Sequence, residues 1–322
     1  MRGGWRCLLL AALCQAGLAQ AQAPFPNKPI RLIVTSPAGG SNDILNRTLG
    51  AKLAENLGQP VLIDNRPGAS GFVAAEMVAK SPADGYTLLA ATEATLVTNP
   101  LFFPKVPYDP ERDFAPVTIA VEVSYVLLVH PSVPAKTVRE LIALARSKPG
   151  QLNYASSGNG SSFHLSMELF KRMAGVDIVH VPFKGSALSV NSMLAGEVQI
   201  MFNGTPNGVP LAKSGRLRAL AVAGAKRSPL APELPTIAES GLPGYEMGGW
   251  FGTVAPTGTP APVIAKLNSE YVRALRAPEV RERLEGFGFE VVGSTPSEFA
   301  SRMRSESQRV ARVIRESGAK PD

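Results

Sequence analysis

The chain has 322 residues, of which 45% are hydrophobic and 18% charged, and this length suits two ordinary domains. The apolar fraction excludes an intrinsically disordered chain, and 30 glycines with 28 prolines in no fixed period exclude a collagen-like one. A formal charge of +7 on 33 basic residues is too mild to indicate nucleic acid or an anionic membrane as the partner.

Residues 1–21 have the pattern of an export signal. Arg2 and Arg6 precede an apolar run that begins at Leu8, and Ala19-Gln20-Ala21 fits the small-x-small cleavage rule. The run is shorter than the roughly 20 apolar residues that a membrane-spanning helix needs. We therefore expect an exported chain that is cleaved after Ala21.

Cleavage at that point would remove both cysteines, Cys7 and Cys14. The mature chain would then have no disulfide, thiolate metal site or cysteine nucleophile. Its longest uncharged stretch, 247–265, is interrupted by glycines and prolines that mark turns. We expect a soluble protein with no direct insertion into a membrane.

Strand-like and helix-like segments alternate along the mature chain. In the first part the pattern predicts strands at 30–34, 61–63 and 87–90 and a helix at 43–57. In the second part it predicts helices at 137–147, 161–174 and 186–194 and strands at 152–155, 178–183, 198–202 and 217–222. Two amphipathic helices are expected to close the chain. This alternation favours a parallel sheet with helices on both faces.

Two long extended segments, near 117–129 and 244–256, bracket the second series. The simplest layout is one lobe from 22–123 and 247–322 (lobe 1) and another from 124–246 (lobe 2). Two strands would cross between the lobes and act as a hinge, with a ligand cleft between the lobes.

Two loops are built alike, at 33–45 and 153–165. Each consists of a strand, a loop rich in glycine and serine, and the start of a helix. Glycines let a ligand approach the main chain, and the first turn of a helix offers free N–H groups and a positive dipole end. Such a loop can hold an anion without a charged side chain. The alternative is that Ser41 and Ser161 or Ser162 are ordinary helix N-caps.

Nucleotide binding and catalysis have little support. No Gly-Lys dipeptide occurs, which excludes a Walker A loop, and the histidines His130, His164 and His180 belong to no H-E-x-x-H motif. We expect no catalytic residue, metal site or cofactor. His164 stays open as a ligand contact, a base or a packing residue, whereas His130 and His180 are expected to be structural.

Motifs in a fixed order then point to a family. They include KPIR (28–31), PAGGSND (37–43), DNRPGA (64–69), PADGYTLL (82–89), LNYASSG (152–158), HVPFKG (180–185) and GLPG (241–244). From about residue 25 to its end the chain resembles the Bug (Bordetella uptake gene) family, the extracytoplasmic binding proteins of tripartite tricarboxylate transporters. The resemblance implies an α/β fold of the type II periplasmic binding protein class, with two lobes joined by two crossing hinge strands.

The resemblance also implies a function. A small organic carboxylate would be captured in the periplasm and delivered to integral-membrane permease subunits by a monomeric protein with no enzymatic role. Two alternatives are a ligand-sensing adaptor for a signalling partner and a hydrolytic enzyme that uses His164. The expected ligand-binding residues are Ser36, Ala38, Gly39, Gly40, Ser41, Asn42, Thr92, Ser157, Gly158, Gly160, Ser161, His164, Lys184, Gly185 and Asn203.

The sequence departs from the family pattern at two places in this set. Thr35-Ser36 stands where the family usually has proline and an aromatic residue, so one wall of the pocket would be smaller and more polar. Asn203 stands where many members have an aspartate. This change would disfavour a ligand ammonium group, which needs a carboxylate partner.

Overall fold

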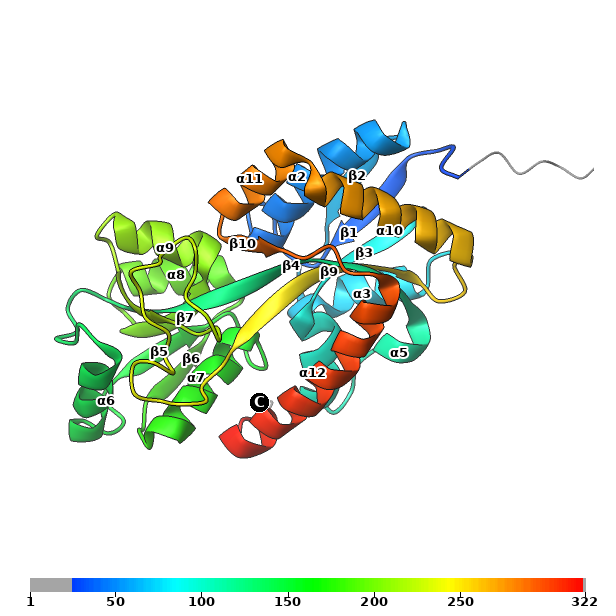
Figure 1. Ribbon diagram of the computed structural model, residues 1–322. Helices are drawn as coiled ribbons and strands as arrows, with labels where there is room; N and C mark the ends of the chain where they lie inside the picture. Colours follow the sequence, from blue (N-terminus) through cyan, green and yellow to red (C-terminus); the bar gives the residue numbers. More distant parts are fainter. Residues whose placement is uncertain (1–24, 321–322) are drawn as a thin grey trace, which may run out of the picture.

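The computed structural model describes residues 25–320 and shows two groups of helices and strands, joined by two long strands (Figure 1). The predicted signal segment and its cleavage site lie outside the described residues. The arrangement confirms the prediction of two α/β lobes, while the lobe boundaries given above stay a prediction.

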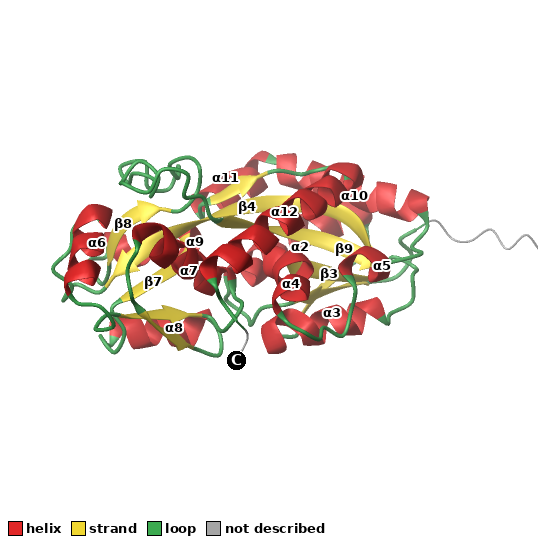
Figure 2. Cartoon of the chain, turned by 90° about the horizontal axis from the view of Figure 1, so that it is seen from below, coloured by secondary structure: helices red, strands yellow, loops and turns green. Residues whose placement is uncertain are grey.

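Lobe 1 is built on three parallel strands, β1 (Ile30–Val34), β2 (Val61–Asn65) and β3 (Thr87–Thr92). Its longer helices are α2 (Ser41–Leu57), α3 (Phe72–Ala79), α10 (Ala261–Arg276), α11 (Pro278–Gly286) and α12 (Pro296–Ser317). Shorter elements complete it: η1 (Ala69–Gly71), η2 (Ala94–Thr98), α4 (Asn99–Phe102), α5 (Pro110–Asp113) and β10 (Phe289–Val291). The helices cover both faces of the sheet (Figure 2).

Lobe 2 repeats the same plan. Strands β5 (Asn153–Ser156), β6 (Val179–Pro182) and β7 (Ile200–Gly204) are parallel, and β8 (Arg218–Val222) pairs with the crossing strand β4. The helices are α6 (Val138–Ser147), α7 (Ser162–Ala174), α8 (Ser186–Leu194) and α9 (Thr205–Lys213).

Strand β4 (Phe114–Val129) runs through both lobes. One part of it pairs with β9 (Gly248–Pro256) and β10, and the part from Tyr125 onward pairs with β7 and β8. The result is one continuous strand order, β2-β1-β3-β9-β4-β7-β5-β6. The strands for which a parallel sheet was predicted are parallel in both lobes. The crossing strand β9 is an addition to that plan: it returns the chain from lobe 2 and lies antiparallel to both β4 and β3.

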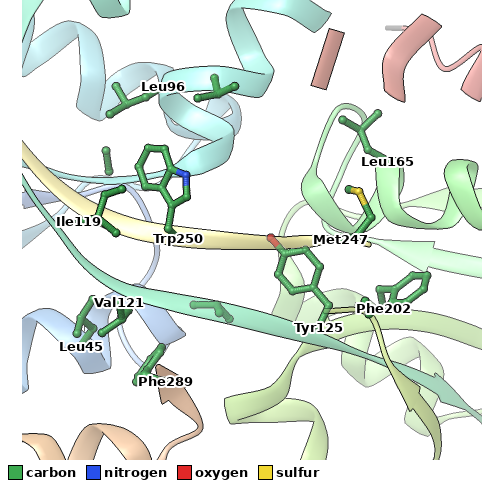
Figure 3. Close-up of a cluster of buried hydrophobic side chains, with 14 of the residues drawn as sticks. Leu45, Leu96, Ile119, Val121, Tyr125, Leu165, Phe202, Met247, Trp250 and Phe289 are labelled. Atoms are coloured by element: carbon green, nitrogen blue, oxygen red, sulfur yellow. The ribbon is translucent and has the colours of Figure 1, made fainter. Parts of the chain in front are cut away.

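The middle of β4 and β9 is packed with large side chains. Trp250 and Tyr125, both buried, lie on the two strands between apolar residues of the two lobes, such as Ile119 and Phe202 (Figure 3). Gly249 has a clear packing reason, because a Cβ atom there would lie 2.3 Å from the Tyr125 hydroxyl oxygen. The hinge strands are therefore held by close packing at the point where they pass between the lobes.

The sequence analysis missed several helix boundaries. Three helices close the chain in place of the two expected, because Pro278 starts a new helix directly after α10 ends at Arg276. Helix α9 was not predicted, since Pro206, Gly208 and Pro210 are poor residues for a helix interior. Within the described residues, we find no helix with the length and apolar character needed to cross a membrane.

Candidate functional site

A cavity of about 520 Å³ lies between the lobes. Both glycine loops reach it, lobe 1 through residues 36–42 and lobe 2 through Ser157 and Ser161. The crossing strands add Val123, Tyr125 and Trp250 as its floor. The two similar loops therefore face one common space from opposite lobes, as the sequence analysis expected.

The first loop is fixed by a buried carboxylate. Gly39 takes the left-handed conformation (φ 81°), and its N–H donates to Asp43 Oδ2 at 2.8 Å. Arg47 and Asn65 donate to the same carboxyl group. Burial pushes the pKa of Asp43 upward, but these hydrogen bonds outweigh it and leave the pKa below its ordinary value. Asp43 therefore stays ionised and holds the loop in shape.

The helix that follows this loop leaves main-chain donors at the cavity. Gly40 is the N-cap of α2 and provides no side-chain cap, and the first helical hydrogen bond runs from Ile44 N–H to the Gly40 carbonyl. The N–H groups of Ser41 and Asn42 come before that bond and have no partner within the helix. Both residues line the cavity.

The second loop presents α7 in the same way. The Ser161 hydroxyl caps this helix by accepting a hydrogen bond from His164 N–H at 3.2 Å. The N-cap alternative is therefore correct for Ser161. It is wrong for Ser41, because Gly40 occupies the cap position and the Ser41 hydroxyl accepts a hydrogen bond from Asn207 Nδ2 of lobe 2 at 3.0 Å.

Two more helices begin at the cavity. The N-caps of α8 and α9 are Gly185 and Gly204, and the cavity lining includes Ser186 of α8 and Asn207 of α9. Four helix N-termini thus meet at one space, and each brings a positive dipole end and free N–H groups. No lysine, arginine or histidine side chain of the described residues lines this cavity. Its attraction for an anion comes from the backbone.

Buried side-chain donors add to these amides. Asn203 is 1% exposed, and its Oδ1 accepts a hydrogen bond from Gly204 N–H at 2.8 Å. Asn203 and Trp250 both line the cavity, and the Asn203 Nδ2 and the Trp250 Nε1 are buried with no hydrogen-bond partner among the described residues. A buried unsatisfied N–H group costs about 1–3 kcal/mol, so these two atoms point to a ligand with acceptor oxygens.

The predicted site residues fall into two groups. One group lines the cavity and consists of Ser36, Ala38, Gly39, Gly40, Ser41, Asn42, Thr92, Ser157, Ser161 and Asn203. The other lies outside the lining and consists of Gly158, Gly160, His164, Lys184 and Gly185. Within the second group, the N–H groups of Gly158 and Gly160 are bonded to Ser156 Oγ and His164 Nδ1, and Lys184 is exposed.

His164 supports the loop from behind. It is buried, and its ring stacks on the ring of His180 with 4.1 Å between centroids. His180 Nε2 in turn shares a hydrogen bond with the Ser156 hydroxyl at 2.7 Å. Burial, with His164 and Lys171 nearby, lowers the pKa of His180 to about 3, so this ring stays neutral. The stack therefore positions the second glycine loop.

The sequence analysis missed the carboxylic acid of the cavity lining, Glu93. It directly follows β3, is 4% exposed and lines the cavity. Burial raises the pKa of Glu93 to about 7. Its position was a usable signal, because Glu93 directly follows the predicted site residue Thr92 at the carboxyl end of a parallel strand, where ligands of such sheets bind.

The lobes contact each other around the cavity. Besides the bond from Asn207 to Ser41, the Ser162 hydroxyl of lobe 2 donates to Glu93 Oε2 at 3.4 Å. Gly160 packs on Phe102 of lobe 1 so closely that a Cβ atom would lie 2.5 Å from the phenylalanine ring. The two lobes are thus in direct contact at several points around the site.

Comparison with known proteins identifies the family. A family model described as tripartite tricarboxylate transporter family receptor matches residues 45–319. Protein BugT of Bordetella pertussis is 38% identical over 297 residues, which are 92% of this chain and 91% of BugT.

Two solved structures are similar over most of this chain. The structure of R. palustris Rpa4515 with adipate has 40% sequence identity and a TM-score of 0.89, and the match covers 92% of this chain and 100% of that one. MatC from Rhodopseudomonas palustris with bound malate has 35% identity and a TM-score of 0.84, with 90% and 100% covered. The chain belongs to the tripartite tricarboxylate transporter receptor family, which confirms the resemblance to Bug proteins.

Proposed function

We propose that this member of the tripartite tricarboxylate transporter receptor family is a periplasmic protein that binds a small organic carboxylate between its lobes and delivers it to membrane permease subunits. The observation that carries the proposal is the cavity itself. Four helix N-termini surround it, together with Asn203 and Trp250, whose side-chain N–H donors are buried and unpartnered among the described residues. No cationic side chain of the described residues lines it. Such a site attracts carboxylate oxygens through the main chain.

The cavity lining supports a ligand with an apolar body between polar ends. Between the polar loops the walls carry apolar side chains, among them Ala94, Val123, Phe163, Val190 and Leu211. The similar structures with adipate and malate bound are consistent with a ligand of this class. We therefore expect a dicarboxylate of about four to six carbons to bind more tightly than a densely hydroxylated tricarboxylate, because each buried methylene contributes about 0.8 kcal/mol.

Closure of the lobes would distinguish the ligand-bound protein from the free protein. A ligand that contacts both lobes interacts fully only with the closed form, so binding shifts the protein toward that form. A difference of about 3 kcal/mol in its interaction with the two forms changes their ratio more than a hundredfold. The permease would recognise the closed protein. A non-enzymatic role agrees with the position of His164, whose Nδ1 accepts a hydrogen bond from Gly160 N–H behind the loop.

A thermal-shift screen tests the proposal. Mono-, di- and tricarboxylates of two to eight carbons should include one or a few acids that raise the melting temperature, since binding to the native state stabilises it. Isothermal titration with the same acids should then give saturable one-to-one binding, and NMR of the recovered acid should show no product. A chain that responds to none of these acids, or that converts one of them, would contradict the proposal.

A further inference from the structure

Glu93 is the one acid among the described residues that line this anion-attracting cavity. Its side chain is 4% exposed, and no cation of the described residues forms an ion pair with it. Its hydrogen bonds are from two hydroxyl groups, Thr98 Oγ1 to Oε1 at 2.9 Å and Ser162 Oγ to Oε2 at 3.4 Å. Two neutral donors are weak compensation for a buried negative charge.

The charged and titratable groups that act on Glu93 come from two other elements. Arg309 on α12 favours the ionised form, but Arg309 is also the ion-pair partner of Glu306, whose negative charge acts the opposite way. Tyr125 on β4 lies close enough to Glu93 to feel its charge, and burial raises the pKa of the tyrosine. None of these groups gives Glu93 a dedicated positive partner.

A bound carboxylate ligand would add a second negative charge next to Glu93, which already lacks a positive partner. Two carboxylates in one enclosed site cannot both stay ionised at low cost, and one of them then holds a proton near neutral pH. The ligand is already stabilised by four helix N-termini and N–H donors, whereas Glu93 receives two hydroxyl hydrogen bonds. The proton therefore belongs on Glu93, where it can serve as a donor to the ligand.

We infer that Glu93 is a specificity residue that enters the ligand-bound site as a neutral carboxylic acid and donates a hydrogen bond to an oxygen of the ligand, so that capture of one carboxylate ligand takes up one proton. The inference rests on the proposed function. The inference extends the proposed function in two ways. Binding should tighten as pH falls, and the site should prefer a ligand with an acceptor oxygen at Glu93 over a ligand with an ammonium group there. Because Glu93 contacts Ser162 of the other lobe, protonation of Glu93 would also be linked to closure of the lobes.

Proton counting by titration calorimetry tests this inference, with adipate as the probe and malate as a second probe. Binding is measured at pH 6 and pH 8, each in two buffers of different ionisation enthalpy. At pH 8 the free Glu93, with a pKa of about 7, is largely ionised, so close to one proton should be taken up per ligand. At pH 6 the uptake should be small, and the Kd should be about tenfold lower than at pH 8.

The variant Glu93→Gln keeps a neutral donor of nearly the same shape. It should bind adipate within about threefold of the wild type at pH 6, with no proton uptake at pH 8. Glu290→Gln removes an exposed acid of β10 and should keep the full uptake.

Three results would overturn the inference: wild-type binding without proton uptake at pH 8, affinity that rises with pH, or an uptake that persists in Glu93→Gln. The wild-type proton count alone decides the matter if that variant does not fold. Failure of both probes to bind would instead refute the proposed function for this class of ligand, and this inference with it.

Discussion

Asn203→Asp is the substitution that probes the cavity most sharply. The change keeps the acceptor atom that holds Gly204 N–H at 2.8 Å and replaces the buried, unpartnered Nδ2 by an oxygen. A hydrogen bond to a charged acceptor contributes about 1.5–3 kcal/mol, and this contribution is lost. A new negative charge about 4 Å from the ligand carboxylate adds roughly 4 kcal/mol of repulsion at an effective dielectric constant of 20.

The lost hydrogen bond and the repulsion both weaken binding, and proton uptake by the introduced carboxyl group would offset only part of the repulsion. We therefore expect the Kd for adipate to rise by at least about a thousandfold at pH 7, since 1.4 kcal/mol is a factor of ten in the Kd. Asn203→Ala introduces no charge but removes both the donor to the ligand and the acceptor of Gly204 N–H, and the lost ligand hydrogen bond alone should raise the Kd about 10- to 150-fold. Calorimetric titration measures both.

The matched control is Asn56→Asp at the end of α2. Its Nδ2 is also buried and unpartnered within the described residues, but Asn56 lies outside the cavity. This variant should bind adipate like the wild type. If Asn203→Asp folds with wild-type stability and its Kd stays within about threefold, Asn203 does not face the ligand and the reasoning is refuted.

Three further predictions concern closure and pH. Gly160→Ala would place a Cβ 2.5 Å from the Phe102 ring of the facing lobe, and the Kd for adipate should rise at least about tenfold. Gly175 has a similar φ of 62° but open space around it, so Gly175→Ala should only lower the free energy of unfolding by about 1–2 kcal/mol. Ser41→Ala and Asn207→Ala should each weaken binding about two- to tenfold, and the double variant should be no worse than either, because the two residues share one bond; additive losses would contradict this. Because His180 stays neutral in the folded protein, the unfolded chain binds the extra proton, so stability should fall from pH 6.5 toward pH 3, and melting curves should show a smaller fall for His180→Gln.

The sequence predicted the parts of the fold that depend on local pattern. Strand Ile30–Val34 and helix Ser186–Leu194 were placed within their observed bounds, because β-branched runs and apolar spacing mark them directly. The direction of β9 could not be predicted in this way, since pairing with β3 and β4 is set by the return path of the chain from lobe 2.

The same limit applies to the site. The likeness of the two glycine loops indicated Gly40 and Ser161 before any coordinates, and both line the cavity. Asn207 was missed because its helix is interrupted by prolines. Glu93 was missed although its position directly after a parallel strand was a usable signal, because its burial has no signature in the sequence. His164 shows the opposite case: its place in the first turn of α7 suggested a ligand contact, but the ring packs on His180 behind the loop.

A crystal structure with a bound carboxylate tests the central claim most directly. We predict that one ligand carboxylate lies within about 3.2 Å of main-chain N–H groups at the start of α2 and α7, with Asn203 Nδ2 as a further donor and no lysine or arginine side chain in contact. A carboxylate held by cationic side chains, or bound outside the space between the lobes, would contradict the account.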